Sequence, residues 1–238
     1  MASFSLRQFV NILIQEFRQY KITFILIGVN ILMYLVTMFV AKNMMTFDTR
    51  SLADLGALFG PFTVLRDEWW RLLTAMFLHG GMTHLLMNMF SLYIIGRSAE
   101  LYFDTKSYLS IYFFSGFIGG LISLYVHPVA VGVGASGAIF GVFGALAGFF
   151  LAHRDKIASH TKAFMKQFAI IIGVNLALGF AIESVDVSAH LGGLVVGFIG
   201  GYVLSKNKKF LIPYVVVMVS IMLGIASYLP SLYVQEFF

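Results

Sequence analysis

The sequence predicts an all-α polytopic membrane protein. Of its 238 residues, 59% are hydrophobic and only 11% are charged, and its mean hydropathy is +0.88. Soluble domains carry about a quarter charged residues, so these values exclude a soluble globular domain. The apolar residues are gathered in long runs without charge, which is typical of transmembrane helices.

The net charge and the cysteine content indicate which partners and which kinds of chemistry to expect. The formal net charge is +5, but the basic residues fall in short segments between apolar runs, where they set topology and meet anionic lipid. We therefore expect the lipid bilayer and transmembrane proteins as partners, and no nucleic acid. The chain has no cysteine, which excludes a disulfide framework, a thiol nucleophile and thiolate metal sites.

The N-terminal residues 1–21 are predicted to form an amphipathic helix in the membrane interface. Apolar residues recur there at helical spacing opposite polar ones: Leu6, Phe9, Val10, Leu13 and Phe17. The first transmembrane span is predicted over residues 22–41, a charge-free run of 20 residues that covers roughly 30 Å. Residues 42–82 mix charged, aromatic and apolar side chains and are expected to form a long external loop, partly embedded in the membrane.

The rest of the chain is predicted to hold six more spans. The second starts near Met82, and the 47 uncharged positions 107–153 are divided at His127 and Pro128 into spans 107–126 and 137–152. Three further charge-free runs cover 167–182, 187–205 and 210–235. The expected architecture is a six-helix core over residues 22–205, followed by a seventh transmembrane helix within residues 206–238.

The distribution of basic residues predicts a cytoplasmic N-terminus. In that orientation the external segments hold only Lys42, Arg50, Arg66 and Arg71, and the other twelve of the 16 Lys and Arg residues are internal. The segment before Ser136 and the loop 183–188 are then external. This topology, and the lack of an organelle-type presequence, lead us to expect a multi-pass protein of a bacterial plasma membrane.

Ser136 is the first functional candidate, since polar residues inside a membrane protein are costly. Glycines between 132 and 141 allow a tight turn that places this serine at the N-terminal mouth of the fourth span. Free backbone N–H groups and the positive end of a helix dipole would face an anion formed there. The alternative is a small residue that serves close helix packing.

His190 opens the sixth span, which runs in the same direction as the fourth. Taken alone, it could be a proton relay or a capping residue. Small residues recur at helical spacing in both spans: Gly137, Gly141, Gly144 and Gly148, and Ala189, Gly193, Gly197 and Gly201. Such stripes let helix backbones approach closely, which would bring Ser136 and His190 to similar depth. A serine beside an imidazole is an activated nucleophile.

A third polar cluster enters the second span from outside. His84 and Asn88 are four residues apart, share one helix face and can both donate a hydrogen bond to one point, as an oxyanion hole requires. The competing interpretation is a zinc site formed by His79, His84 and His190. The chain has no His-Glu-x-x-His sequence and no suitably spaced intramembrane carboxylate, so we expect neither a metal nor another cofactor.

Over residues 68–201 the chain resembles the rhomboid intramembrane serine proteases. The matching motifs, in order, are Trp70-Arg71, His84 with Asn88, Gly96-x-x-x-Glu100, Gly134-x-Ser136-Gly137, and Ala189-His190 with Gly193 and Gly197. The resemblance implies a six-helix catalytic core with one extra C-terminal span. It also implies a serine endopeptidase that cleaves transmembrane segments of membrane proteins near the outer face of the bilayer.

The motif match also implies a role for each polar position. Ser136 would be the nucleophile and His190 the general base. The oxyanion hole would be formed by His84, Asn88 and the Ser136 backbone N–H. Phe140 matches an aromatic position that packs under the catalytic imidazole, and Trp70, Gly96 and the motif glycines match structural positions.

The remaining charged positions are expected to be structural. Arg71 and Glu100 match structural positions of the family, where we expect loop-anchoring hydrogen bonds. The carboxylates nearest to His190 in the sequence are Glu183 and Asp186. Asp186 could orient the imidazole if its helix began early, but we expect it in an exposed loop and so predict a dyad rather than a triad.

Two other function classes stay open at this point. A transporter or channel would bind a small solute at interrupted helices in two related halves, but the sequence shows no convincing internal repeat. A non-proteolytic membrane chaperone on the same scaffold is disfavoured because Ser136 and His190 are both present. For a protease, substrate access is expected to require displacement of the fifth span, 167–182, or of the loop 183–188.

Overall fold

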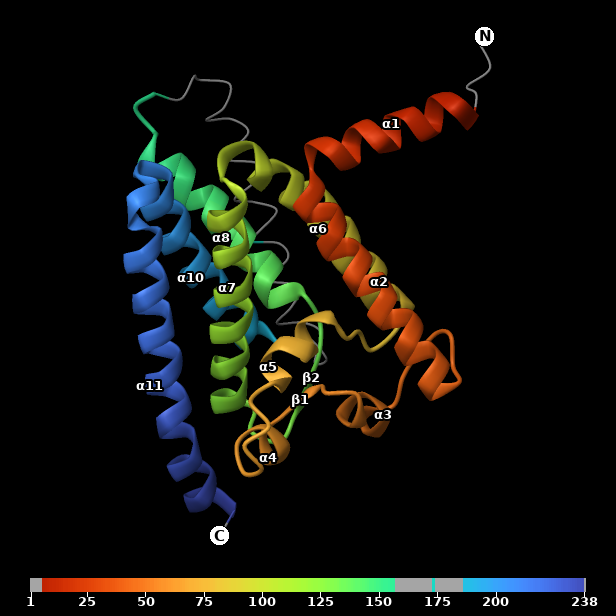
Figure 1. Cartoon of the computed structure of the whole chain (residues 1–238). Coiled ribbons are helices and arrows are strands. Elements are labelled where there is room, and N and C mark those ends of the chain that lie inside the picture. The colour runs from red at the N-terminus through yellow and green to blue at the C-terminus, as the bar shows by residue number, and fades with distance from the viewer. Residues whose placement is uncertain (1–5, 157–172, 174–185, 238) are drawn as a thin grey trace.

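The structure is a computed structural model that describes residues 6–156, 173 and 186–237, and this part of the chain is predominantly helical. Figure 1 shows long helices side by side, with short elements gathered at one end. The long helices are α1 (Leu6–Gln19), α2 (Lys21–Ala41), α6 (Met82–Tyr102), α7 (Thr105–Val126), α8 (Ser136–Ala152), α10 (Val187–Lys206) and α11 (Leu211–Phe237). The short elements are α3 (Thr49–Asp54), β1 (Leu58–Phe59), α4 (Gly60–Thr63), α5 (Arg71–Thr74), η1 (Ala75–Phe77), β2 (Val131–Gly132) and η2 (Lys208–Phe210).

Within the described residues, four helical segments are long and apolar enough to cross a membrane. They are α2, α7, α10 and the run Lys208–Gln235, most of which is α11. Helix α8 is apolar, but its 17 residues are fewer than the 18 that this length criterion requires. Helix α6 begins at the predicted Met82 and carries the charged residues Arg97 and Glu100 in its last turns. The chain is therefore a multi-pass integral membrane protein. The predicted fifth span, 167–182, lies outside the described residues.

Helix α6 anchors the N-terminal part of the chain. Helix α1 points away from the bundle (Figure 1), and its Glu16 accepts a hydrogen bond from Arg97 of α6, with 3.0 Å between Oε1 and Nη2. Glu100 accepts hydrogen bonds from the backbone N–H groups of Ile22 (3.1 Å) and Thr23 (2.7 Å). Helix α2 has no side-chain cap of its own at this end. Glu100 therefore satisfies two first-turn N–H groups that would otherwise lack partners.

Helices α8 and α10 make the most extensive helix contact of the described chain. A Cβ placed on Gly193 would lie 2.0 Å from the backbone oxygen of Gly137, and one on Gly197 would lie 1.8 Å from that of Gly141. Both distances are far below van der Waals contact, so the two backbones touch directly at these glycines. The predicted stripes of small residues are thus the surfaces along which the two helices pack.

A short antiparallel strand pair joins the long first loop to the segment before α8. Leu58 of β1 pairs with Gly132 of β2, and Phe59 pairs with Val131. Strand β2 ends four residues before Ser136. The pairing therefore ties the position of the chain just before α8 to that of the first loop.

Arg71 holds the first loop in shape. Its side chain is buried, and its Nη1 donates hydrogen bonds to the backbone oxygens of Ala53 (2.6 Å) and Ala57 (3.0 Å). Its Nε and Nη2 contact Glu68, each at 2.6 Å. The ring of Trp70 lies under the guanidinium, 4.8 Å from its carbon. Arg71 thus fastens the loop segment that leads into β1.

Candidate active site

Ser136 and His190 lie side by side at the N-terminal ends of α8 and α10. Ser136 Oγ and His190 Nε2 are 2.7 Å apart, which is hydrogen-bond distance. Ser136 is the first residue of α8, and His190 lies in the first turn of α10 with 7% of its surface exposed. The two residues are 54 positions apart in the chain. They meet because both helices run in the same direction and pack backbone to backbone.

The His190 imidazole is held in place by an aromatic ring. Phe140 stacks on it, with ring centroids 4.4 Å apart and ring planes 13° from parallel. Since Phe140 follows Ser136 by one helical turn, a single helix presents both the hydroxyl and the supporting ring. Among the described residues, His190 Nδ1 is buried without a hydrogen-bond partner.

Asp186 caps α10 and is not the exposed loop residue that the sequence suggested. Its side chain is 29% exposed, and its Oδ1 accepts hydrogen bonds from the backbone N–H of Ala189 (3.1 Å) and from the Ser188 hydroxyl. Burial raises the pKa of Asp186, but hydrogen bonds from Ser123, Ser188 and Ala189 outweigh this effect and lower it below its usual value. An N-cap signal, Asp at the start of an apolar run, was available in the sequence for this position.

His84 approaches the serine from α6, across Gly134. A Cβ placed on Gly134 would lie 2.8 Å from His84 Nε2 and 3.8 Å from Ser136 Oγ. Gly134 has a φ of +121°, where side chains are strained, so both its conformation and the adjacent imidazole require glycine. Its N–H donates to the backbone oxygen of Ala75 at 2.9 Å, a contact for which the sequence carries no signal.

Asn88 lies one turn after His84 on the same face of α6 and is buried. Its Nδ2 donates a hydrogen bond to the backbone oxygen of His84 at 3.0 Å. An amide nitrogen carries two hydrogens, so this bond leaves one for another acceptor. The Ser136 backbone N–H belongs to the first turn of α8, whose N–H groups have no acceptor within the helix.

His79 packs behind His84. It is fully buried, and the two rings meet edge to face with centroids 5.0 Å apart. Burial, together with the neighbouring His84, lowers the pKa of His79 to about 3, so this side chain is neutral at physiological pH. In the part of the chain that the structure describes, no three His, Asp or Glu side chains converge on a common point. His79, His84 and His190 therefore do not form the ligand set that the zinc interpretation needs.

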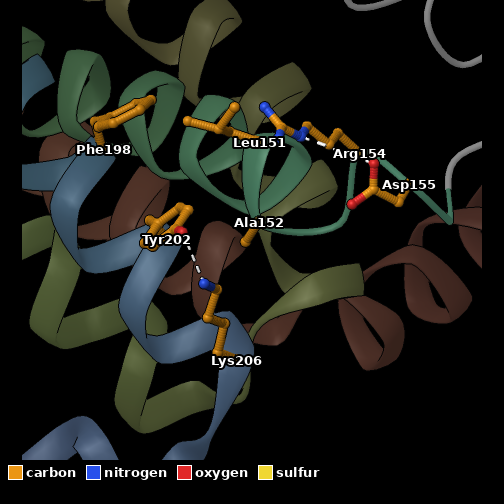
Figure 2. A pocket seen from close by; sticks show the side chains of 7 residues that line it. All are labelled: Leu151, Ala152, Arg154, Asp155, Phe198, Tyr202 and Lys206. Carbon is orange, nitrogen blue, oxygen red and sulfur yellow. Dashed lines mark hydrogen bonds and ion pairs between the residues drawn. The ribbon is translucent and has the colours of Figure 1, made fainter.

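A hollow lies between the C-terminal parts of α8 and α10, and Figure 2 shows the side chains that line it. It has a volume of about 400 Å³ and lies between Leu151 and Arg154 on one side and Phe198, Tyr202 and Lys206 on the other. These residues lie in the C-terminal halves of the two helices or just beyond them, whereas the serine and the histidine lie in the first turns. The 17 residues of α8 span about 25 Å, so the hollow does not reach the serine.

Comparisons with known proteins match this part of the chain. The Rhomboid domain family model matches residues 66–207. RHOMBOID-like protein 6, mitochondrial, of Arabidopsis thaliana is 41% identical over 159 residues, which cover 67% of this chain and 51% of that protein. Rhomboid protease GluP of Bacillus subtilis is 34% identical over 186 residues, which cover 78% of this chain and 35% of that protein.

A shorter relative is matched over more of its length. The putative rhomboid protease YdcA of Bacillus subtilis is 33% identical over 147 residues, which cover 61% of this chain and 72% of that protein. By contrast, the chain spans about half the length of the Arabidopsis protein and about a third of GluP.

Proposed function

The chain belongs to the rhomboid family, and from that premise we propose that it is an intramembrane serine endopeptidase with Ser136 as nucleophile and His190 as general base. The observation that carries the proposal is the 2.7 Å distance between Ser136 Oγ and His190 Nε2. A serine hydroxyl is a weak nucleophile until an adjacent base takes its proton. The Phe140 ring that stacks on His190 supports the proposal, because it keeps the imidazole in the orientation that this proton transfer requires.

Each step moves one proton through His190. Nε2 accepts the hydroxyl proton while Oγ attacks the carbonyl carbon of the scissile peptide, and the imidazolium then gives that proton to the leaving amine. A water molecule next loses a proton to Nε2 and attacks the acyl-serine, and the proton returns to Oγ as the acid product leaves. Nε2 must start unprotonated, so Nδ1 carries the ring hydrogen. Asp186 is itself the N-cap of α10, and its carboxylate accepts a hydrogen bond from the Ala189 N–H, which favours a dyad.

The oxyanion of the tetrahedral intermediate would be bound by His84, Asn88 and the Ser136 backbone N–H. His84 reaches the site across Gly134, Asn88 has one amide hydrogen left, and the Ser136 N–H lies in the first turn of α8. The dipole of α8 adds its positive end at the same point. Donors that are fixed before the substrate arrives stabilise developing charge best, which supports assigning this role to groups held by helices α6 and α8.

The proposed substrates are transmembrane segments of membrane proteins, cleaved near the outer face. With a cytoplasmic N-terminus and six helices plus one, the N-terminal ends of α8 and α10 face outward. A helix shields its carbonyls, so we expect preference for substrate helices whose outer end contains glycine, proline or other weak helix formers. The predicted access route, 167–182, lies outside the described residues. A bacterial plasma membrane stays a prediction, since the relatives include a plant protein named as mitochondrial.

The test is covalent labelling of purified protein in detergent with a fluorophosphonate, which reacts with activated serines. We expect labelling of the wild type, and loss of both labelling and proteolysis in Ser136→Ala and His190→Ala. Ser220→Ala is the matched control, because Ser220 is exposed on α11 and its hydroxyl bonds to its own helix. Proteolysis that persists in Ser136→Ala would overturn the mechanism, and an unlabelled, inactive wild type would favour a transporter or a chaperone.

A further inference from the structure

The end of α11 packs against the elements that lead to Ser136, although it lies beyond the residues 66–207 that the family model matches. Leu229 and Tyr233 are fully buried there, whereas Val216 and Leu223, farther up the same helix, are more than half exposed. The buried pair belongs to a cluster with residues of β1, α5 and α7: Leu58, Leu72, Leu121 and Leu124. The last turns of α11 are therefore part of the bundle core, at the end that carries the site (Figure 1).

The Tyr233 hydroxyl holds the end of α7. It donates a hydrogen bond to the backbone oxygen of Leu124 at 2.7 Å and lies 3.2 Å from that of Pro128. Leu124 is in the last turn of α7, where carbonyl groups have no partner within the helix. Inside a protein core no bulk water can replace that partner, so the hydroxyl supplies what the helix end lacks.

Gly60, in the first loop, contacts Tyr233 and Pro128 at the end of α7. A Cβ placed on Gly60 would lie 2.0 Å from the Pro128 oxygen and 2.2 Å from the Tyr233 hydroxyl oxygen. Gly60 directly follows β1, and β2 begins three residues after Pro128. The Tyr233 hydroxyl thus lies at a junction where the end of α7, β1 and the segment before β2 meet. The segment that follows β2 runs through Gly134 to Ser136.

We propose that Tyr233 is a positioning residue for Ser136: its hydroxyl fixes the junction of α7, β1 and β2, and thereby the segment that aims the serine at His190. The proposal rests on the proposed function, because the serine matters only if it reacts. The hydrogen bonds of the Tyr233 hydroxyl to the backbone oxygens of Leu124 and Pro128 lie at this junction. Its effect would therefore reach the chemistry through the placement of Gly134 and Ser136.

The test compares Tyr233→Phe, which keeps the packed ring and removes the hydroxyl, with Tyr228→Phe on the exposed face of the same helix. Three quantities are measured in detergent: the fluorophosphonate labelling rate per folded molecule, kcat and KM for a transmembrane substrate, and the melting temperature. We expect Tyr233→Phe to lower the labelling rate and kcat about tenfold with little change in KM, since small misplacements of reacting groups are costly. Tyr228→Phe should match the wild type.

The outcomes separate this proposal from the proposed function. A wild type without labelling or proteolysis would remove the proposed function itself, before any variant is compared. An active wild type with an unchanged labelling rate per folded molecule in Tyr233→Phe would overturn the positioning role, even if the melting temperature fell. Gly60→Ala gives a second readout, because its added methyl group would push apart the same junction and should lower the labelling rate in the same way.

Discussion

Gly197→Ala tests whether the dyad depends on the direct contact between α8 and α10. The added Cβ would lie 1.8 Å from the Gly141 oxygen, 2.4 Å from its carbonyl carbon and 2.6 Å from its Cα. Because all three are backbone atoms, no side-chain rotation can relieve the overlap. Ordinary contact begins near 3.4 Å, so the helices must separate locally by 3.4 − 1.8, or about 1.6 Å.

A separation of this size is large beside the geometry of the site. Residue 197 lies two turns, about 10 Å, from His190. If half of that shift, about 0.8 Å, reached the helix ends, the distance between Ser136 Oγ and His190 Nε2 would lengthen from 2.7 Å to about 3.5 Å, beyond the usual hydrogen-bond range. A misplacement of about 1 Å costs roughly 10²-fold in rate, and overpacking costs about 1–3 kcal/mol in stability. We therefore expect kcat to fall about 10²-fold and the melting temperature to decrease.

The assay follows cleavage of a transmembrane substrate and fluorophosphonate labelling at a temperature well below both melting transitions. Gly28→Ala is the control, since a Cβ there meets nothing within 4 Å and alanine favours a helix over glycine. Wild-type kcat and labelling in Gly197→Ala would refute the reasoning, because the dyad would then tolerate separated helices.

Three further substitutions test individual contacts. Asn88→Ala should lower kcat by roughly 10²- to 10³-fold with little change in KM, as the loss of an oxyanion donor does in other enzymes. Wild-type turnover in steady-state assays would instead show that Asn88 serves only helix packing. Asp186→Asn keeps an acceptor for the α10 cap and should keep kcat within a few fold, whereas the same change in a triad costs about 10⁴-fold. The pKa of His79 is about 3 in the folded protein and about 6.5 in the unfolded chain. Below pH 6.5 the unfolded chain therefore binds more protons than the folded protein. The free energy of unfolding then falls by up to about 1.4 kcal/mol per pH unit as the pH decreases toward 3. His79→Phe should thus show a smaller drop in melting temperature between pH 7 and pH 5 than the wild type, and an equal drop would contradict the buried neutral state.

The sequence by itself determined the class of protein and the positions of most described helices. Charge-free runs mark helices because each backbone polar group in a bilayer must be satisfied within its own segment, which is a local requirement. The starts of α6 at Met82 and of α10 at Val187 follow the predicted runs. The glycine stripes likewise predict close packing of two helices, because spacing along a helix decides which residues share a face.

Only the tertiary structure decided which groups meet across helices. Ser136 and His190 are 54 positions apart, and their 2.7 Å distance follows from the rotation of α8 against α10, which no local pattern specifies. The same holds for Glu100, which caps α2 from α6, and for Tyr233, which closes the end of α7. These contacts satisfy backbone groups that a helix end leaves without partners, and the partner comes from whichever element the fold brings near.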